Sequence, residues 1–247
     1  VQDVSLENIN VTSYRTMAGG ISSEVSYIKK AMGYGYALLD KIDAKNVQVQ
    51  VLNRGADENA YTGGLYGYAP NIIAHEVALD SMQVDGSGRF TGGMIGYTNV
   101  RADYDYSAYG SGEDRVQYFL SVFDKITLTN SSVQGTACVG GLFGYSPYWS
   151  LNHNICLDKN VVLGQGNCVG GMAGQINNGY TTDVVVQNQQ VYNSGESKYT
   201  GGIAGYHTGH GTRRTAGVGI QVLASGESSY GGGLYGSGPT TRDTAEH

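Results

Sequence analysis

One motif recurs along this chain and constrains the fold more than any local preference does. It joins a glycine pair to an apolar residue and a further glycine, as in residues 61–68, YTGGLYGY. The second glycine of the pair recurs at Gly20, Gly64, Gly93, Gly141, Gly171, Gly202 and Gly233. The intervals between these glycines are 44, 29, 48, 30, 31 and 31 residues. Such self-similarity at about 30 residues is typical of a stacked repeat architecture.

A second repeated segment, eight residues long and called the first box below, precedes each glycine pair. Residues 4–11, VSLENINV, align without a gap with residues 77–84, VALDSMQV. Further copies begin at Ile42, Ile126, Ile155, Val184 and, more weakly, Val218. Apolar residues at alternate positions predict a β-strand in this box. A turn such as residues 85–88, DGSG, then leads to the strand of the glycine pair.

The repeat predicts the fold class, because a single unit cannot bury its apolar face whereas stacked units can. We expect an all-β protein, a parallel β-helix (β-solenoid) of about seven coils of roughly 30 residues, right-handed, with two or three strands per coil. It forms one repeat domain over residues 1–236, followed by a C-terminal tail at 237–247. The alternative is a propeller or a β-sandwich, but a propeller blade needs about 40 residues.

The glycine-pair strand also predicts which side chains face the core. The residue after the pair is aliphatic in all seven copies, for example Leu65 and Met94. Because side chains alternate in a strand, the residue four positions earlier, such as Tyr61 or Phe90, is expected on the same inward face. The inward glycines between them leave room only for backbone, so another part of the coil or a stacked tyrosine should lie against them.

The composition argues against several classes of partner. Only 15% of the residues are charged and the net charge is −6, so a nucleic-acid-binding face is not expected. No apolar run approaches the roughly 18 residues of a membrane helix, and no signal peptide precedes the first repeat. The chain begins inside a repeat, which we interpret as a piece of a longer protein. The 20 tyrosines, against 4 phenylalanines, suit half-exposed strands and binding surfaces.

The motif resembles a known repeat family. The Gly-Leu-any-Gly core of residues 64–67, 141–144 and 233–236 is similar to the GLUG repeat. The resemblance extends from about Val4 to Gly236, although several copies have Met or Ile in place of Leu. GLUG repeats occur in large secreted and surface proteins of bacteria, such as adhesins and the non-catalytic regions of immunoglobulin A-cleaving metallopeptidases. The resemblance implies an extracellular or cell-surface, non-catalytic module that acts as a stalk or as an adhesive surface for a glycan or a host protein.

Two insertions, near residues 22–39 and 98–118, follow the glycine-pair strand and should lie on one side of the solenoid. Insertions at one point of a repeat often form its binding side. The aromatic residues expected there, and hence the predicted ligand-binding residues, are Tyr104, Tyr106, Tyr109, Tyr148, Trp149 and Tyr180. The alternative is that these are solvated loops whose tyrosines contact their own coil.

No catalytic residue and no cofactor are expected, but one acidic cluster offers an alternative. It consists of Asp103, Asp105, Glu113 and Asp114. These oxygen ligands are weak candidates for a calcium site. As paired carboxylates they would instead fit a carbohydrate-active β-helix enzyme, a polysaccharide lyase or hydrolase. His207 and His210 are read as a loop pair without acidic or cysteine partners, which argues against zinc.

The cysteines provide a test of register. Cys138 and Cys168 hold the same repeat position in successive copies, so in-register coils place them about 4.8 Å apart. That distance permits a disulfide. We nevertheless favour two stacked free thiols in a core position, because cysteine is readily buried as a small apolar residue. Cys156 neighbours inward residues and is expected to face outward, unpaired.

Overall fold

The computed structural model describes residues 1–14, 17–25, 29–30, 33–34, 37–52, 60–98, 121–146, 150–195, 199–208, 212–226 and 229–238. In these residues the chain forms strands and turns and no helix. Accordingly, no part of the described chain is a helix long and apolar enough to cross a membrane. The prediction of an all-β fold is confirmed.

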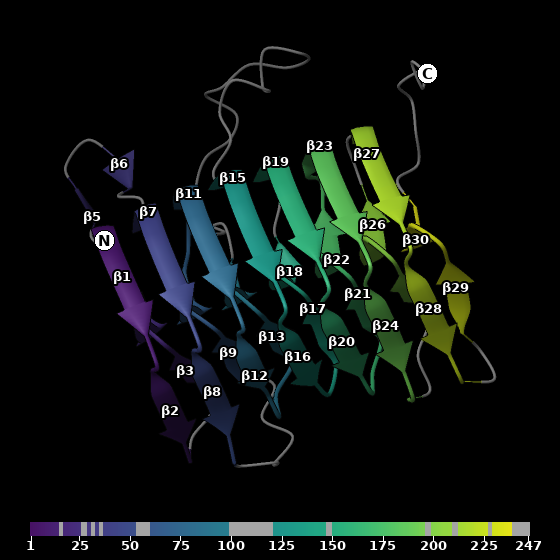
Figure 1. The fold of residues 1–247 in the computed structure, drawn as a ribbon, viewed down its shortest axis with the longest axis horizontal. Helices are drawn as coiled ribbons and strands as arrows, with labels where there is room; N and C mark the ends of the chain where they lie inside the picture. The colour runs from purple at the N-terminus through teal and green to yellow at the C-terminus, as the bar shows by residue number, and fades with distance from the viewer. Residues whose placement is uncertain are drawn as a thin grey trace.

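Four parallel sheets of seven strands each run along the molecule (Figure 1). Sheet A contains β1 (Gln2–Glu7), β7 (Ala37–Lys45), β11 (Ile72–Asp80), β15 (Ser121–Thr129), β19 (Ser150–Asp158), β23 (Tyr180–Gln187) and β27 (Thr212–Val218). Sheet B contains β2 (Asn10–Ser13), β8 (Gln48–Val51), β12 (Gln83–Asp85), β16 (Ser132–Gly135), β20 (Val161–Gly164), β24 (Gln190–Asn193) and β28 (Gln221–Ala224).

The other two sheets are built from the glycine-pair motif. Sheet C contains β3 (Met17–Gly19), β9 (Tyr61–Gly63), β13 (Phe90–Gly92), β17 (Cys138–Gly140), β21 (Cys168–Gly170), β25 (Tyr199–Gly201) and β29 (Tyr230–Gly232). Sheet D contains β4 (Ser22–Glu24), β10 (Tyr66–Tyr68), β14 (Ile95–Tyr97), β18 (Phe143–Ser146), β22 (Ala173–Asn177), β26 (Ala204–Thr208) and β30 (Tyr235–Ser237). Two short antiparallel strands, β5 (Lys29–Lys30) and β6 (Gly33–Tyr34), follow β4 and precede β7 along the chain.

Each of the seven coils takes one strand from every sheet in the order A, B, C, D, so the predicted parallel β-helix is confirmed. Identical repeat positions pair in register; Cys138, for example, lies beside Cys168. In Figure 1 the chain descends along the near A strands, returns behind them and advances toward the C-terminal coil, which is a right-handed wind. The first expected insertion begins and ends on coil strands, since residues 22–24 form β4 and residues 37–39 open β7.

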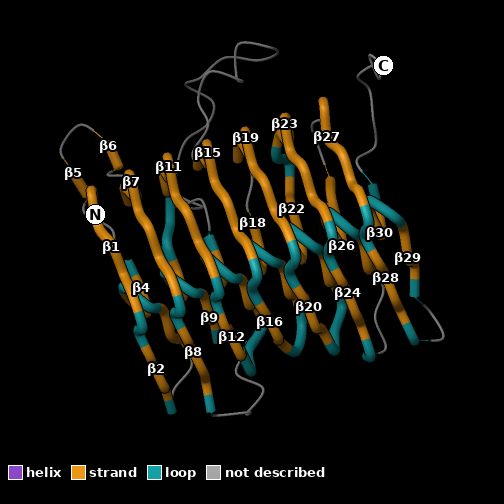
Figure 2. Tube along the Cα trace, viewed as in Figure 1, coloured by secondary structure: helices purple, strands orange, loops and turns teal. Residues whose placement is uncertain are grey.

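The expectation of two or three strands per coil is wrong, because a corner divides the first box into an A strand and a B strand. Figure 2 shows this turn between the A and B strands of successive coils. The corner residue has a positive φ in every coil: Asn8, Asn46, Ser81, Asn130, Lys159, Asn188 and Gly219. Asparagine and glycine tolerate this left-handed conformation better than most residues. The corner also shifts the alternation by one residue, so Leu6 and Ile9, rather than Leu6 and Asn8, both contact the main core.

A second bend divides the glycine-pair strand into a C strand and a D strand whose backbones touch. A Cβ added to Gly92 would lie 2.2 Å from the carbonyl oxygen of Ile95, in the same coil. A Cβ added to Gly93 would lie 2.1 Å from the carbonyl oxygen of Gly141, in the next coil. Only glycine fits such a close approach of backbone to backbone. The expectation that other backbone of the coil lies against the glycines is therefore confirmed.

The interior divides into two apolar clusters, and a third lies outside the main core. The main core lies between sheets A and D and contains Leu65, Met94 and Leu142, so the aliphatic residue after the glycine pair does face inward. A valine cluster lies between sheets B and C. The third cluster contains Phe90 and Cys138 with tyrosines of sheet D. The prediction that this position shares a face with the aliphatic residue is wrong, because the glycine bend rotates the chain between them.

Candidate functional site

The predicted ligand-binding loops mostly fall outside the described residues. This applies to Tyr104, Tyr106, Tyr109, Tyr148 and Trp149 and to the acidic cluster Asp103, Asp105, Glu113 and Asp114. The residues that flank these segments join sheet D to the N-terminal ends of sheet A strands, as Ser146 and Ser150 do. Tyr180 is described: it opens β23, is half-buried and pairs with Leu151 of the neighbouring coil.

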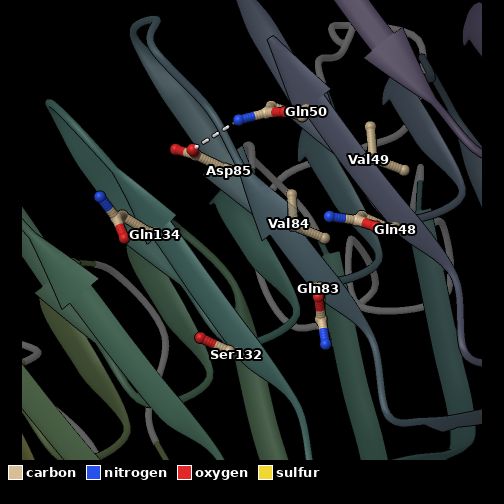
Figure 3. Close-up of a pocket in the computed structure, with 8 residues that line it drawn as sticks. All are labelled: Gln48, Val49, Gln50, Gln83, Val84, Asp85, Ser132 and Gln134. Atoms are coloured by element: carbon tan, nitrogen blue, oxygen red, sulfur yellow. Dashed lines mark hydrogen bonds between the residues drawn. The ribbon is translucent and has the colours of Figure 1, made fainter. Parts of the chain in front are cut away.

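The outer face of sheet B carries a hollow that was not predicted (Figure 3). It has a volume of about 330 Å³ and crosses the second, third and fourth coils. Val49 and Val84 also line it, and its polar lining consists of Gln48, Gln50, Gln83, Asp85, Ser132 and Gln134. Three adjacent coils thus present amide, carboxylate and hydroxyl groups to one open depression.

The hollow follows from strand alternation in the B strands. Val49, Val84 and Val133 point into the interior and are at most 2% exposed. The residues on either side of them therefore point outward. Register then stacks Gln48 beside Gln83 and Gln50 beside Asp85.

Most of the polar groups in the hollow are free to meet a ligand. Gln50 Nε2 donates to Asp85 Oδ2 over 3.4 Å, which leaves the other carboxylate oxygen available. The amides of Gln83 and Gln134 make no side-chain hydrogen bond to other described residues. Each amide can both donate and accept, so the set can recognise neighbouring hydroxyl groups.

The hollow ends where the lining becomes apolar. In the fifth coil, Val161 replaces the residue equivalent to Ser132, and Leu163 replaces the residue equivalent to Gln134. Tyr192 and Leu223 continue the apolar row in the sixth and seventh coils. The row that contains Gln50, Asp85 and Gln134 is therefore polar only up to the fourth coil, although the row that contains Gln83 becomes polar again at Gln190 and Gln221. In the sequence, this hollow is marked by glutamines that recur at outward positions of the B strands. The prediction had placed the binding site on the inserted loops instead.

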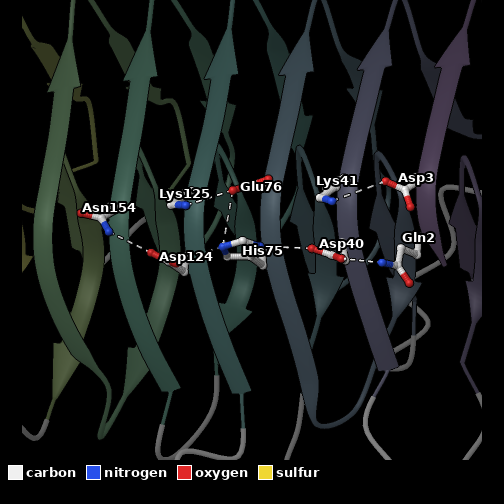
Figure 4. A network of polar contacts seen from close by, with 9 residues as sticks. All are labelled: Gln2, Asp3, Asp40, Lys41, His75, Glu76, Asp124, Lys125 and Asn154. Atoms are coloured by element: carbon white, nitrogen blue, oxygen red, sulfur yellow. Dashed lines mark hydrogen bonds and ion pairs between the residues drawn. The ribbon is translucent and has the colours of Figure 1, made fainter.

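The outer face of sheet A carries a network of charged side chains (Figure 4). His75 Nδ1 lies 3.1 Å from Asp40 Oδ1, and His75 Nε2 lies 3.6 Å from Asp124 Oδ2. Lys125 Nζ donates to Glu76 Oε1 over 2.9 Å, and this hydrogen bond with its positive charge lowers the pKa of Glu76. Each of these acids lies beside a base of a neighbouring coil, which is the arrangement expected of an ion-pair ladder between neighbouring strands.

A partly buried row of aromatic rings follows the C and D strands. The ring centroids of Tyr61 and Tyr97 lie 4.7 Å apart, and those of Phe90 and Tyr97 lie 4.9 Å apart. Cys138 and Cys168 interrupt this row and are 7% and 6% exposed. All three cysteines are free, so the stacked thiols that were favoured are confirmed. The thiols lie in this outer cluster rather than in the main core, and Cys156 is only half-buried.

His207 belongs to strand β26 rather than to a loop, which corrects the interpretation of a loop pair with His210. Its side chain is fully buried, and burial lowers its pKa to about 4. His210 lies outside the described residues. Within the described chain, no group of three or more His, Cys, Asp or Glu side chains is arranged to hold a metal ion.

The chain was compared with models of protein families, with curated proteins and with solved structures, and none of them matches it. The functional argument therefore rests on the geometry of this chain.

Proposed function

We propose that this chain is a non-catalytic repeat domain that binds a glycan in the hollow of sheet B. The observation that carries the proposal is the depression of about 330 Å³ with six polar side chains from three coils. Sugar hydroxyl groups both donate and accept hydrogen bonds, as do the glutamine amides that line it. Asp85 adds a carboxylate, whose hydrogen bonds to hydroxyl groups are stronger than those of neutral acceptors.

The spacing of the coils also suits an extended polymer. Neighbouring coils repeat about every 4.8 Å, which is close to the length of one hexose unit. A chain of sugars that lies across the hollow along the solenoid axis would meet one set of outward polar residues per unit. This geometry favours a linear polysaccharide over a compact ligand.

The resemblance of the motif to the GLUG repeat is our reason for proposing that this binding takes place in the extracellular space. In that setting the domain would belong to a secreted or cell-surface bacterial protein of the adhesin type. The stacked coils would then act as a stalk, and the hollow would provide the adhesive surface. A host protein is the other partner that such a surface would meet, through the glycans it carries or through its own side chains.

The alternative function is a carbohydrate-active β-helix enzyme. Its candidate carboxylates, Asp103, Asp105, Glu113 and Asp114, lie outside the described residues. A glycosidase needs one carboxyl group with a raised pKa as its acid. In the described part of the chain, the carboxyl groups with shifted pKa values, Glu76, Asp80 and Asp183, are all shifted downward. These three groups do not provide such an acid, and the proposal of binding without cleavage rests on the hollow of sheet B.

The test is binding of the purified chain to an array of neutral and acidic polysaccharides, repeated with two variants. Gln83→Ala with Gln134→Ala removes two exposed amides from the hollow. Gln190→Ala is the matched control, because Gln190 is also exposed and holds the same position as Gln83 three coils further on. The double variant should lose about tenfold or more in affinity, since each lost hydrogen bond contributes about 1 kcal/mol.

The control variant should bind like the original chain. Equal binding by all three proteins would place the site elsewhere and refute the proposal for the hollow. Release of reducing ends or of unsaturated sugar products from the bound polysaccharide would support the enzyme instead.

A further inference from the structure

Two cysteine thiols lie side by side in the cluster of rings on sheets C and D. Cys138 and Cys168 hold the same repeat position in the fourth and fifth coils and pair in register on strands β17 and β21. Both are free, and the two thiols hydrogen-bond to each other. The pair therefore offers two adjacent sulfur donors, on a different sheet from the hollow.

Aromatic rings enclose the pair at both ends of its row. Phe90 pairs with Cys138 on one side, and Tyr199 pairs with Cys168 on the other. These rings, with Tyr145, belong to the same apolar cluster as the thiols. The two cysteines remain 7% and 6% exposed, so solvent still reaches them from one side. An apolar shell of this kind limits access of water and lowers the local dielectric constant around a bound ion.

Arg89 places a positive charge beside the pair. Cys138 N donates to the carbonyl oxygen of Arg89 over 2.9 Å, and the guanidinium carbon lies 5.1 Å from the centroid of the Phe90 ring. The hydrogen bond with the Cys168 thiol and, after it, the charge of Arg89 lower the pKa of Cys138. The same hydrogen bond and burial raise the pKa of Cys168. One thiol thus loses its proton readily, whereas the other keeps it until a ligand displaces it.

The spacing of the two strands suits an ion between the sulfurs. Side chains in register on neighbouring strands are separated by about 4.8 Å. A bond from sulfur to an ion such as Zn²⁺ is about 2.3 Å long, so a linear sulfur–metal–sulfur bridge spans about 4.6 Å. A disulfide would instead require the sulfurs to approach to about 2.05 Å. The stacked pair can therefore hold an ion with little change in the backbone.

We propose that Cys138 and Cys168 form a two-coordinate site for a soft monovalent cation of the Cu(I) class. Thiolate sulfur is the donor that Cu(I) prefers in proteins. Binding replaces both thiol protons, which pass to solvent, and leaves a bis-thiolate complex with a net charge of about −1. The guanidinium of Arg89 offsets this charge.

The number of donors determines which ions the site accepts. A structural zinc site has four ligands. In the part of the chain that the structure describes, no third His, Cys, Asp or Glu side chain completes a set with the two thiols. Cu(I) and Ag(I) accept two sulfur donors in a line. The site therefore selects these ions over Zn²⁺ by coordination number, although thiolate binds all three.

The test is a titration of the reduced protein with Ag(I) and, under oxygen-free conditions, with Cu(I). Thiolate-to-metal absorption in the ultraviolet reports binding, and competition with bicinchoninate gives the affinity for Cu(I). We expect one tightly bound ion per chain, which excess Zn²⁺ does not displace. Cys138→Ser and Cys168→Ser should each lower the affinity by about a hundredfold or more, since the linkage of two donors raises affinity by about 10²–10⁴.

Two further variants separate this site from other thiols and from a merely structural effect. Cys156→Ser is the matched control, because Cys156 is a free, half-buried thiol on sheet A, and it should retain the bound ion. Arg89→Gln keeps both donors and removes the compensating charge, so it should weaken binding by about tenfold. Circular dichroism verifies the fold of each variant.

X-ray absorption of the Cu(I)-loaded original protein tests the coordination directly. Two sulfur neighbours and no other ligand are expected. Three or more neighbours, the absence of tight binding, unchanged affinity in either serine variant of the pair, or loss of the ion in Cys156→Ser would each overturn the proposal. A metal-dependent dimer in sedimentation velocity would also overturn it, because the ion would then be shared between two chains. Undiminished affinity of Arg89→Gln would contradict the charge compensation.

Discussion

Replacement of Gly141 by alanine should destabilise the solenoid more than its size suggests. The added Cβ would lie 2.1 Å from the carbonyl oxygen of Gly171 and 3.3 Å from its carbonyl carbon. Both atoms belong to backbone that is held by pairing: Gly141 N donates to that same oxygen over 3.1 Å. The neighbouring coil must therefore shift. Overpacking of this kind costs about 1–3 kcal/mol.

For a domain of this size, each kcal/mol lowers the melting temperature by about 2–4 °C. Thermal unfolding followed by circular dichroism should thus show a decrease of about 2–12 °C for Gly141→Ala. The control is Gly233→Ala, which makes the same chemical change at the same repeat position with nothing within 4 Å. The control should melt with the original protein. Equal melting of the two variants would refute the argument that backbone contact fixes these glycines.

Three further results are expected. The hydrogen bond and charge of Arg214 lower the pKa of Asp183 from 3.8 to about 2, so this pair stabilises the fold above pH 3.8 and the contribution is lost as the pH falls to about 2. Acid titrations should show that Arg214→Gln removes this dependence; an unchanged profile would contradict the pairing. Burial lowers the pKa of His207 from 6.5 to about 4, so denaturant stability should fall as the pH drops from 6.5 toward 4 and should stay level in His207→Met. Thiol counting on denatured, unreduced protein should find three free thiols, and Cys156, which is only half-buried, should react first in the folded protein; a single free thiol would show a disulfide instead.

Much of the fold can be predicted from the sequence, because stacking in register repeats one environment along the chain. The glycine interval gives the number of coils, and the aliphatic residue after the pair identifies the core. The number of strands per coil was missed for a local reason. The residues VSLENINV alternate up to Leu6 and resume one position out of phase at Ile9, and the asparagine between them marks a corner.

The candidate site was harder to predict, since it depends on side chains from three coils that are far apart in sequence. Gln50, Asp85 and Gln134 become neighbours only once the register is known. The side chains in the row of Tyr61 and Cys138 were predicted to point into the main core, but they form a separate cluster. Strand alternation alone cannot show that a glycine pair turns the chain. An inserted loop is visible in the sequence as a longer repeat interval. A hollow on a regular sheet is marked only by glutamines that recur at outward positions.

The most direct test of the account is how binding depends on the length of the sugar chain. Oligosaccharides of increasing length, prepared from a polysaccharide that the chain binds, would be titrated by calorimetry. The hollow spans three coils spaced by about 4.8 Å, so affinity should rise with each sugar unit up to about three and then level off. Gln83→Ala should weaken the longer chains most. Affinity that is independent of length and indifferent to Gln83→Ala would contradict a glycan site on sheet B.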